Sequence, residues 1–146
     1  MIQISPGITL EILWHDEYVT EIRFSISNKV FSGSVKAYLD REQLTSFANG
    51  LTGFPKNNID ERTYSFGAPD ESQAGGGAYF RFFCIDGLAH IGVEVSLRSD
   101  VHTPSKRSER CTAFIPLEPA AIDNFTTQLR SMEFKPGESI CLPLAP

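Results

Sequence analysis

The sequence lacks the features that mark membrane, secreted and disulfide-rich proteins. None of its apolar runs approaches the roughly 18 residues that a membrane-spanning helix needs. Its first residues form neither a basic segment nor a sustained apolar one, so no signal peptide is predicted. The three cysteines, Cys84, Cys111 and Cys141, are widely spaced and form no CxxC pair. Reduced thiols in a cytoplasmic protein are the simplest interpretation, and an interchain disulfide is the alternative.

Positive charge is scarce as well. The chain has 13 lysine and arginine residues against 18 aspartate and glutamate residues, a formal net charge of −5. Phosphate binding needs clustered basic side chains, so we do not expect nucleic acid as the main partner. Residues 98–110, which we predict to be a long exposed loop, hold four basic and two acidic residues. That loop has a net charge of +2, which leaves −7 for the rest of the chain. An acidic body favours basic partners, although ordinary solubility charge explains any single residue equally well.

What the sequence does contain is typical of one globular domain. Its 146 residues are 41% hydrophobic and 21% charged, and 11 of them are phenylalanine. A chain of this length is long enough to bury a hydrophobic core of its own. We therefore predict a single domain over residues 1–146 with an aromatic-rich core.

Apolar residues alternate with polar ones along the first part of the chain. A period of two is typical of strands with one buried face, and the alternating apolar positions include Trp14, Tyr18 and Phe31. Short polar breaks between these segments predict hairpin turns and an antiparallel meander. Three strands are predicted there, at 8–14, 18–26 and 31–39.

The strand pattern returns after a long connection. Residues 55–77 are rich in Pro, Asn, Asp, Ser and Gly and are predicted as a loop. Within it, Tyr64 and Phe66 either form a short strand or pack as anchors. The pair Asp86-Gly87 predicts a hairpin. Three further strands are predicted at 79–85, 91–97 and 111–117.

Two segments have the three- and four-residue spacing of an amphipathic helix. The first is predicted at 41–52, with Asp40 as its N-cap and Gly53 near its end. The second opens at Glu118, directly before a proline. The tail at 135–146, which contains three prolines, is predicted to be irregular.

The two helices match at five apolar positions, and the separation along the chain is the same for every pair. Three strands precede each helix, so the simplest architecture is a duplicated βββα unit with half-repeats at 8–54 and 78–134. We predict an α+β fold, with an antiparallel sheet of about six strands and two helices on one face. The alternative is that any two amphipathic helices align on four or five positions. The matching pairs are Leu39/Leu117, Leu44/Ile122, Phe47/Phe125, Leu51/Leu129 and Phe54/Met132.

Histidine and cysteine provide few candidates for chemistry. His15 lies in a predicted turn, His102 in the basic loop, and His90 four residues after Asp86 at the start of a strand. Without any HxH, HxxxH or HxxE pair, we predict no metal and no cofactor. His90 is interpreted as a polar residue beside a hairpin rather than as a ligand or base. Cys84, in an apolar strand, is interpreted as inert packing.

Three other motifs are interpreted structurally. Cys111 stands next to Arg110, whose charge favours a reactive thiolate, but a small core residue at a strand start is the preferred interpretation. The run Gly75-Gly76-Gly77 precedes a strand and does not open a helix as a phosphate loop does, which favours a flexible linker. Residues 78–82 are faintly similar to the aromatic strand of RNA-recognition domains, and core packing is predicted instead.

Four short motifs follow one another along the chain: FSG at 31–33, DREQLTSF at 40–47, HIGVEV at 90–95 and FIPLE at 114–118. In this order they resemble the WapI-like immunity proteins of bacterial polymorphic-toxin systems, and related uncharacterised bacterial domains, over roughly residues 8–132. The resemblance implies a protein that neutralises a cognate toxin by binding it, without catalysis. Such an inhibitor needs a stable scaffold and a surface of about 800 Å² with a few anchors.

The leading functional hypothesis is therefore a cytoplasmic, immunity-type binding protein that is not an enzyme. Its expected partner is a protein, and neither nucleic acid nor a membrane is expected. Tyr64 and Phe66 are candidate anchors, and the rest of the interface is unknown. One alternative is a small-molecule-binding or enzymatic domain that uses His90, Asp86 and Cys111. Another is a structural subunit of a homo-oligomer.

Overall fold

The computed structural model describes residues 4–70, 73–101 and 106–146, and it has the predicted α+β composition. The described residues form two helices and eight strands. In chain order these are β1 (Gly7–His15), β2 (Thr20–Ser27), β3 (Ser32–Leu39), α1 (Arg41–Leu51), β4 (Glu61–Gly67), β5 (Gly77–Cys84), β6 (Ile91–Arg98), β7 (Arg110–Leu117), α2 (Pro119–Arg130) and β8 (Ser139–Pro143). Among these described segments, neither helix is long and apolar enough to span a membrane.

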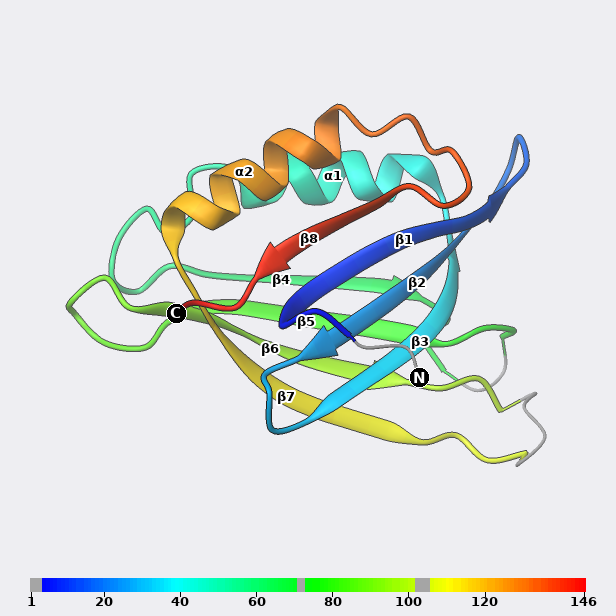
Figure 1. The fold of residues 1–146 in the computed structure, drawn as a ribbon, viewed down its shortest axis with the longest axis horizontal. Helices are drawn as coiled ribbons and strands as arrows, with labels where there is room; N and C mark the ends of the chain where they lie inside the picture. The colour runs from blue at the N-terminus through cyan, green and yellow to red at the C-terminus, as the bar shows by residue number, and fades with distance from the viewer. Residues whose placement is uncertain (1–3, 71–72, 102–105) are drawn as a thin grey trace.

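The strands form two antiparallel sheets of four, not the predicted single sheet of about six. One sheet has the order β3-β2-β1-β8 and the other the order β4-β5-β6-β7. Figure 1 shows the first sheet in front of the second. The hydrophobic faces of the two sheets belong to one core. Alternation in a sequence shows only that a strand has one buried face, so the pattern is the same for one sheet or two.

The order βββα occurs twice, and each half contributes one strand to the other half's sheet. The strand after α1, β4, pairs with β5, while the strand after α2, β8, returns to pair with β1. The helices run side by side in opposite directions (Figure 1). Phe47 of α1 and Phe125 of α2, which form one of the matching pairs in the sequence, are in contact with ring centroids 6.0 Å apart. Equivalent residues meet in this way when two similar units are related by an approximate two-fold axis.

The helices fill the space between two sheet edges and do not cover one face of a single sheet as predicted. α1 packs on β4, and α2 packs on β8. Phe47 reaches between the sheets, with its ring centroid 4.7 Å from Tyr64, 5.1 Å from Phe66 and 5.8 Å from Phe80. On the opposite sheet, Phe24 lies 5.5 Å from Phe66. Ala78, Phe80 and Phe82 are buried, so the core packing predicted for the strand at 78–82 is confirmed for one of its faces, whereas Tyr79 is exposed on the other.

Two segments that were predicted as a loop and an irregular tail contain strands. Tyr64 and Phe66 lie in β4, and Ile140 and Leu142 lie in β8. Each of these strands turns only two apolar side chains toward the core, which is too few for a periodic signal. Both are held by pairing with a strand from the other half, β5 or β1. A partner distant in the sequence therefore decides that these segments are strands.

Both helices begin where predicted, at Asp40 and at Glu118-Pro119, but only the first has a side-chain cap. The Asp40 carboxylate accepts the Glu42 N–H at 2.9 Å, and the Gln43 side chain accepts the Asp40 N–H at 2.9 Å, which makes a reciprocal capping box. Gly53, just after the helix, has the positive φ of +77° that favours glycine. At the N-cap of α2, Glu118 makes no side-chain capping bond.

The glycine run at 75–77 is packed and hydrogen-bonded, which corrects the prediction of a flexible linker. The Gly76 N–H donates to the Lys36 carbonyl at 2.8 Å, and its own carbonyl accepts the Ala68 N–H at 3.0 Å. A Cβ atom on Gly76 would lie 2.6 Å from the carbonyl oxygen of Arg98. Glycine is needed here because three segments approach one another too closely for a side chain.

Candidate binding surface

The structure brings together two residues of the enzyme alternative and separates the third. His90 Nδ1 lies 2.7 Å from Asp86 Oδ2 within the exposed β5–β6 hairpin. This hydrogen bond lowers the pKa of the Asp86 carboxyl below its ordinary value. Cys111 lies near the start of β7. Ile91, beside the hairpin, pairs with Leu117 at the other end of that strand. Six residues of strand span roughly 20 Å, so the three side chains form no catalytic constellation.

The remaining histidines and cysteines are dispersed. His15 ends β1, and His102 lies outside the described residues. The Cys84 thiol donates to the Asn57 carbonyl at 3.4 Å, and burial raises the pKa of this thiol. Cys141 lies in β8, and all three cysteines are free. Within residues 4–70, 73–101 and 106–146, no three His, Cys, Asp or Glu side chains gather as metal ligands would.

The residues considered as anchors in the 55–77 segment belong to the scaffold. Phe66 is buried, and Tyr64 packs edge-on against Phe47. The charged residues beside them also make contacts within the protein. Arg62 forms an ion pair with Asp60 at 2.8 Å and donates to carbonyls at the end of α1. This guanidinium holds the pKa of Asp60 below its ordinary value.

Exposed aromatic side chains lie around the β1–β2 hairpin instead. Simple alternation assigned Trp14 and Tyr18 to buried faces, but Trp14 is 48% exposed and Tyr18 is 80% exposed. The strand register shifts between Ile12 and Trp14. Such a bulge moves the following side chains relative to the sheet faces, and Tyr18 lies in the turn itself. The run His15-Asp16-Glu17 before Tyr18 was the available signal for a turn.

The turn that carries Tyr18 has a well-defined backbone. Asp16 Oδ1 accepts the N–H of Tyr18 at 2.7 Å and that of Val19 at 2.8 Å. The bond from Tyr18 first, and that from Val19 second, lower the pKa of Asp16 below its ordinary value. The Asp16 N–H in turn donates to the Val19 carbonyl at 3.0 Å. Tyr18 therefore projects from an ordered turn, although its ring is mostly in solvent.

Two aromatic residues, Trp14 and Tyr38, flank a carboxylate on the outer face of the first sheet. Strand pairing places Trp14, Glu21 and Tyr38 in one row across β1, β2 and β3. Tyr38 is also exposed. A hydrogen bond with the Glu21 carboxylate raises the pKa of the Tyr38 hydroxyl.

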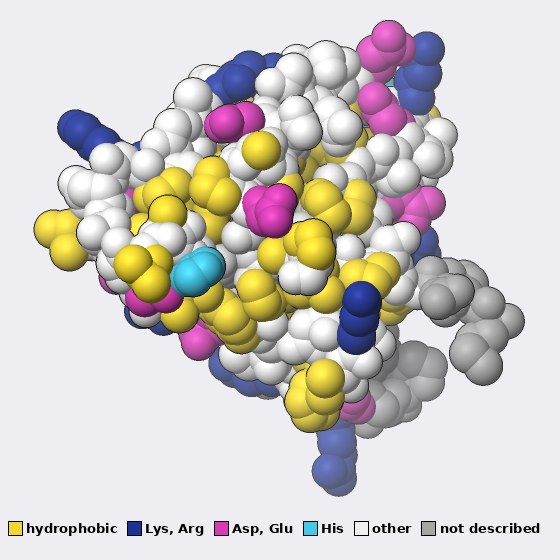
Figure 2. Space-filling model, turned by 60° about the vertical axis from the view of Figure 1, so that its left-hand side comes forward, with side chains coloured by type: hydrophobic (Ala, Val, Ile, Leu, Met, Phe, Trp, Pro, Cys, Tyr) yellow, Lys and Arg dark blue, Asp and Glu magenta, His cyan; other side chains and the backbone are white. Residues whose placement is uncertain are grey.

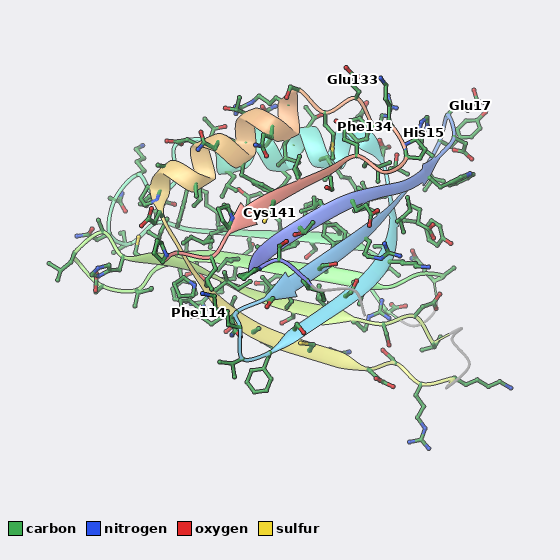
Figure 3. All side chains as sticks on the ribbon, viewed as in Figure 1. His15, Glu17, Phe114, Glu133, Phe134 and Cys141 are labelled. Carbon is green, nitrogen blue, oxygen red and sulfur yellow. The ribbon has the colours of Figure 1, made fainter. Side chains whose placement is uncertain are left out.

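On the other side of the hairpin, a groove of about 640 Å³ separates the turn from the start of α1. Figure 3 shows His15 and Glu17 at this corner of the molecule, and Phe134 belongs to the segment after α2. Arg41 stacks 4.5 Å above the Phe134 ring. Four carboxylates and one guanidinium line the groove, a formal charge of −3 with His15 neutral: Asp16, Glu17, Asp40, Glu42 and Arg41. We call the three aromatic residues Trp14, Tyr18 and Tyr38, with Glu21 and this groove, the acidic end.

The β5–β6 hairpin is the counterpart of this hairpin in the second half. When the two hairpins are aligned on their strand pairing, Asp86 corresponds to Asp16 and Leu88 to Tyr18. Asp86 Oδ1 accepts the Leu88 N–H at 2.7 Å, just as Asp16 accepts that of Tyr18. Leu88 is 76% exposed. Figure 2 shows hydrophobic side chains gathered over the end of the molecule that carries this hairpin and the C-terminus.

Comparisons with known proteins identify no relative of this chain. No protein-family model, no curated protein and no solved structure matches it. The resemblance to WapI-like immunity proteins therefore rests on the four short motifs alone.

Proposed function

We propose that this protein is a non-catalytic binding protein of the immunity type, which neutralises a cognate bacterial toxin by binding it through the acidic end. The observation that carries the proposal is the exposure of three aromatic side chains beside carboxylates. Tyr18 lines the acidic groove, and Trp14 and Tyr38 flank Glu21. Tryptophan and tyrosine are enriched among the residues that dominate the binding energy of interfaces. The motif resemblance to immunity proteins supports the same assignment.

The charge of the acidic end indicates the charge of the partner. Its groove has a formal charge of −3, and Glu21 adds another carboxylate on the outer face of the sheet. Complementary charge steers a basic protein toward such a surface and raises the association rate. Toxins that act on nucleic acids are basic because their substrates are anionic. A basic toxin is therefore the expected partner.

Coexpression with the toxin-like product of a neighbouring gene tests the function itself. We expect the two proteins to copurify, and expression of this chain to restore growth of cells that express the toxin. The association rate should fall as salt is raised, because charge screening shortens to about 10 Å at 0.1 M ionic strength. The proposal fails if no neighbouring gene encodes a toxin-like protein and expression protects against none.

Tyr18→Ala tests the surface. Removing an exposed aromatic anchor should weaken toxin binding at least about tenfold without changing the urea midpoint of unfolding. Tyr79→Ala is the matched control, because Tyr79 is an exposed tyrosine on the outer face of the other sheet. Equal binding by the wild type and Tyr18→Ala would show that the toxin uses another surface.

A further inference from the structure

The end of the molecule opposite the acidic end exposes apolar side chains from four separate segments (Figure 2). They come from the β2–β3 turn, the segment before β4, the β5–β6 hairpin and β7. We call them the apolar end: Val30, Phe31, Ile59, Ile85, Leu88 and Phe114. Such side chains expose on the order of 100 Å² each, about 600 Å² together. Large apolar side chains exposed at one end of a molecule are candidates for an interaction surface.

Hydrogen bonds and ring contacts connect these segments. Asn28 Nδ2 donates to the Phe114 carbonyl at 3.1 Å, which joins the β2–β3 turn to β7. The Phe114 ring lies 5.7 Å from that of Phe83 on β5. The Cys84 thiol donates to the Asn57 carbonyl, which joins the segment before β4 to the same strand. A surface that is ordered before binding loses less conformational entropy when it is covered.

A hollow lies beside the exposed Leu88. It measures about 640 Å³, and most of its lining is apolar, including Ile85, Pro116, Pro119 and Ala145. The same end therefore presents both a projecting aliphatic side chain and an apolar hollow that could receive one. An interface between two identical molecules with two-fold symmetry needs such self-complementarity, because each patch meets its own copy.

Fewer carboxylates line the hollow at this end than line the groove of the acidic end. Lys29 and Lys56 are exposed here, and the carboxylates of Asp86 and Glu118 line the hollow. The hollow is lined by two carboxylates, whereas the groove of the acidic end is lined by four carboxylates and one guanidinium. Two copies of a chain with a net charge of −5 therefore repel each other less through this end than through the acidic end.

We propose that two copies of this chain associate through the apolar end, with Leu88 of each copy seated in the apolar hollow of the other. The exposed apolar area is comparable to the roughly 800 Å² per partner of a standard interface. The acidic ends then point away from each other. The dimer presents both of them to other partners, and it does not depend on the identity of those partners.

Sedimentation velocity over protein concentrations from about 1 to 100 μM, a range that spans typical weak dimers, tests the dimer. We expect the mass to rise toward twice that of the chain, and Leu88→Glu to weaken association at least about tenfold. Tyr18→Glu, at the equivalent hairpin tip, is the matched control and should leave association unchanged. Both side chains are mostly in solvent, so neither change should alter the fold.

Three results would overturn the proposal. The first is a wild-type chain that stays monomeric over the whole range. The second is a dimer that Leu88→Glu does not weaken while the variant keeps the wild-type circular dichroism spectrum. The third is equal weakening by Leu88→Glu and Tyr18→Glu, which would show a general effect of added negative charge.

Discussion

The two hairpins at opposite ends of the molecule share an aspartate hydrogen bond in the turn and differ in what surrounds it. In each, an aspartate side chain accepts the N–H of the residue two positions later, Asp16 from Tyr18 and Asp86 from Leu88. Tyr18 and Leu88 are both mostly exposed at the tips of their hairpins. Around Tyr18 the groove is lined by carboxylates, whereas around Leu88 the hollow is mainly apolar.

This difference indicates that the repeated unit constrains the core and the turns but leaves the surface free. Phe47 and Phe125 occupy equivalent places and touch each other. A change at either position would disturb both halves, because the core is shared. The side chains at the hairpin tips make few contacts with the rest of the molecule, so they can differ between the halves without disturbing the core. One scaffold thereby presents two different binding surfaces at its two ends.

The largest expected effect on stability comes from truncating the two central phenylalanines, Phe47 and Phe125. Phe47→Ala should lower the free energy of unfolding by about 3–5 kcal/mol through lost burial and a cavity. Phe125→Ala should cost less within the same range, because Phe47 also contacts rings of β4 and β5. Urea denaturation of both variants measures this difference. A larger loss of stability for Phe125→Ala would show that Phe125 contributes more to the core than Phe47 does.

The helix starts provide a second contrast, of intermediate size. Asp40→Ala removes one side of the capping box and should cost about 1 kcal/mol of stability. The equivalent change, Glu118→Ala, should stay within about 0.5 kcal/mol, because Glu118 makes no capping bond. Chemical denaturation of both variants provides the comparison. Equal losses would contradict the asymmetry of the two helix starts.

The hairpins also differ in one backbone conformation. Ala89 has a φ of +66°, which is strained for a residue with a Cβ atom. Ala89→Gly should therefore raise stability by about 0.5–1 kcal/mol, since relief of strain exceeds the entropy cost of glycine. Val19→Gly, the equivalent change in the first hairpin, should lower stability instead, because Val19 has no positive φ to relieve. Thermal unfolding of both variants decides the sign.

The smallest effect concerns the two hairpin aspartates. His90→Ala should raise the pKa of Asp86 toward its ordinary value, because the His90 hydrogen bond is the main cause of its depression. The pKa of Asp16 should stay low, since backbone N–H groups of Tyr18 and Val19 depress it. A carboxyl NMR titration of the wild type and the variant measures the shift, and an unchanged Asp86 would contradict the hydrogen bond between the two side chains.

The sign of the accompanying pH dependence follows from these depressed values. Each carboxylate stabilises the folded chain above its ordinary pKa, and the contribution is lost as the pH falls through the lower value of the folded state. In His90→Ala, the stability contributed by Asp86 should therefore be smaller, and its loss should be complete at a higher pH than in the wild type.

Much of the fold could be predicted from local patterns. The meander at the start of the chain, the helix capped by Asp40 and the hairpin at Asp86-Gly87 are all confirmed. Pro116 near the end of edge strand β7 also fits the expectation for a residue without an N–H. These features depend on close neighbours in the chain, so a single sequence contains their signal.

The candidate surfaces could not be predicted in the same way. A bulge after Ile12 reverses the exposure expected for Trp14. Tyr64 and Phe66, considered as surface anchors, are drawn into the core by Phe47, which comes from a different element. Exposure is set by contacts between segments far apart in the chain, and alternation within one segment does not report them.

Local patterning in the sequence was enough to define most elements and their repetition. Period-two and helical spacing predict six of the strands and both helices, and a constant offset between matching apolar positions relates the two helices. Packing between distant segments decided that the strands divide into two sheets, that β4 and β8 exchange between halves, and which aromatic residues reach the surface. The physical reason is that hydrophobic periodicity records that a side chain is buried, but not against which partner.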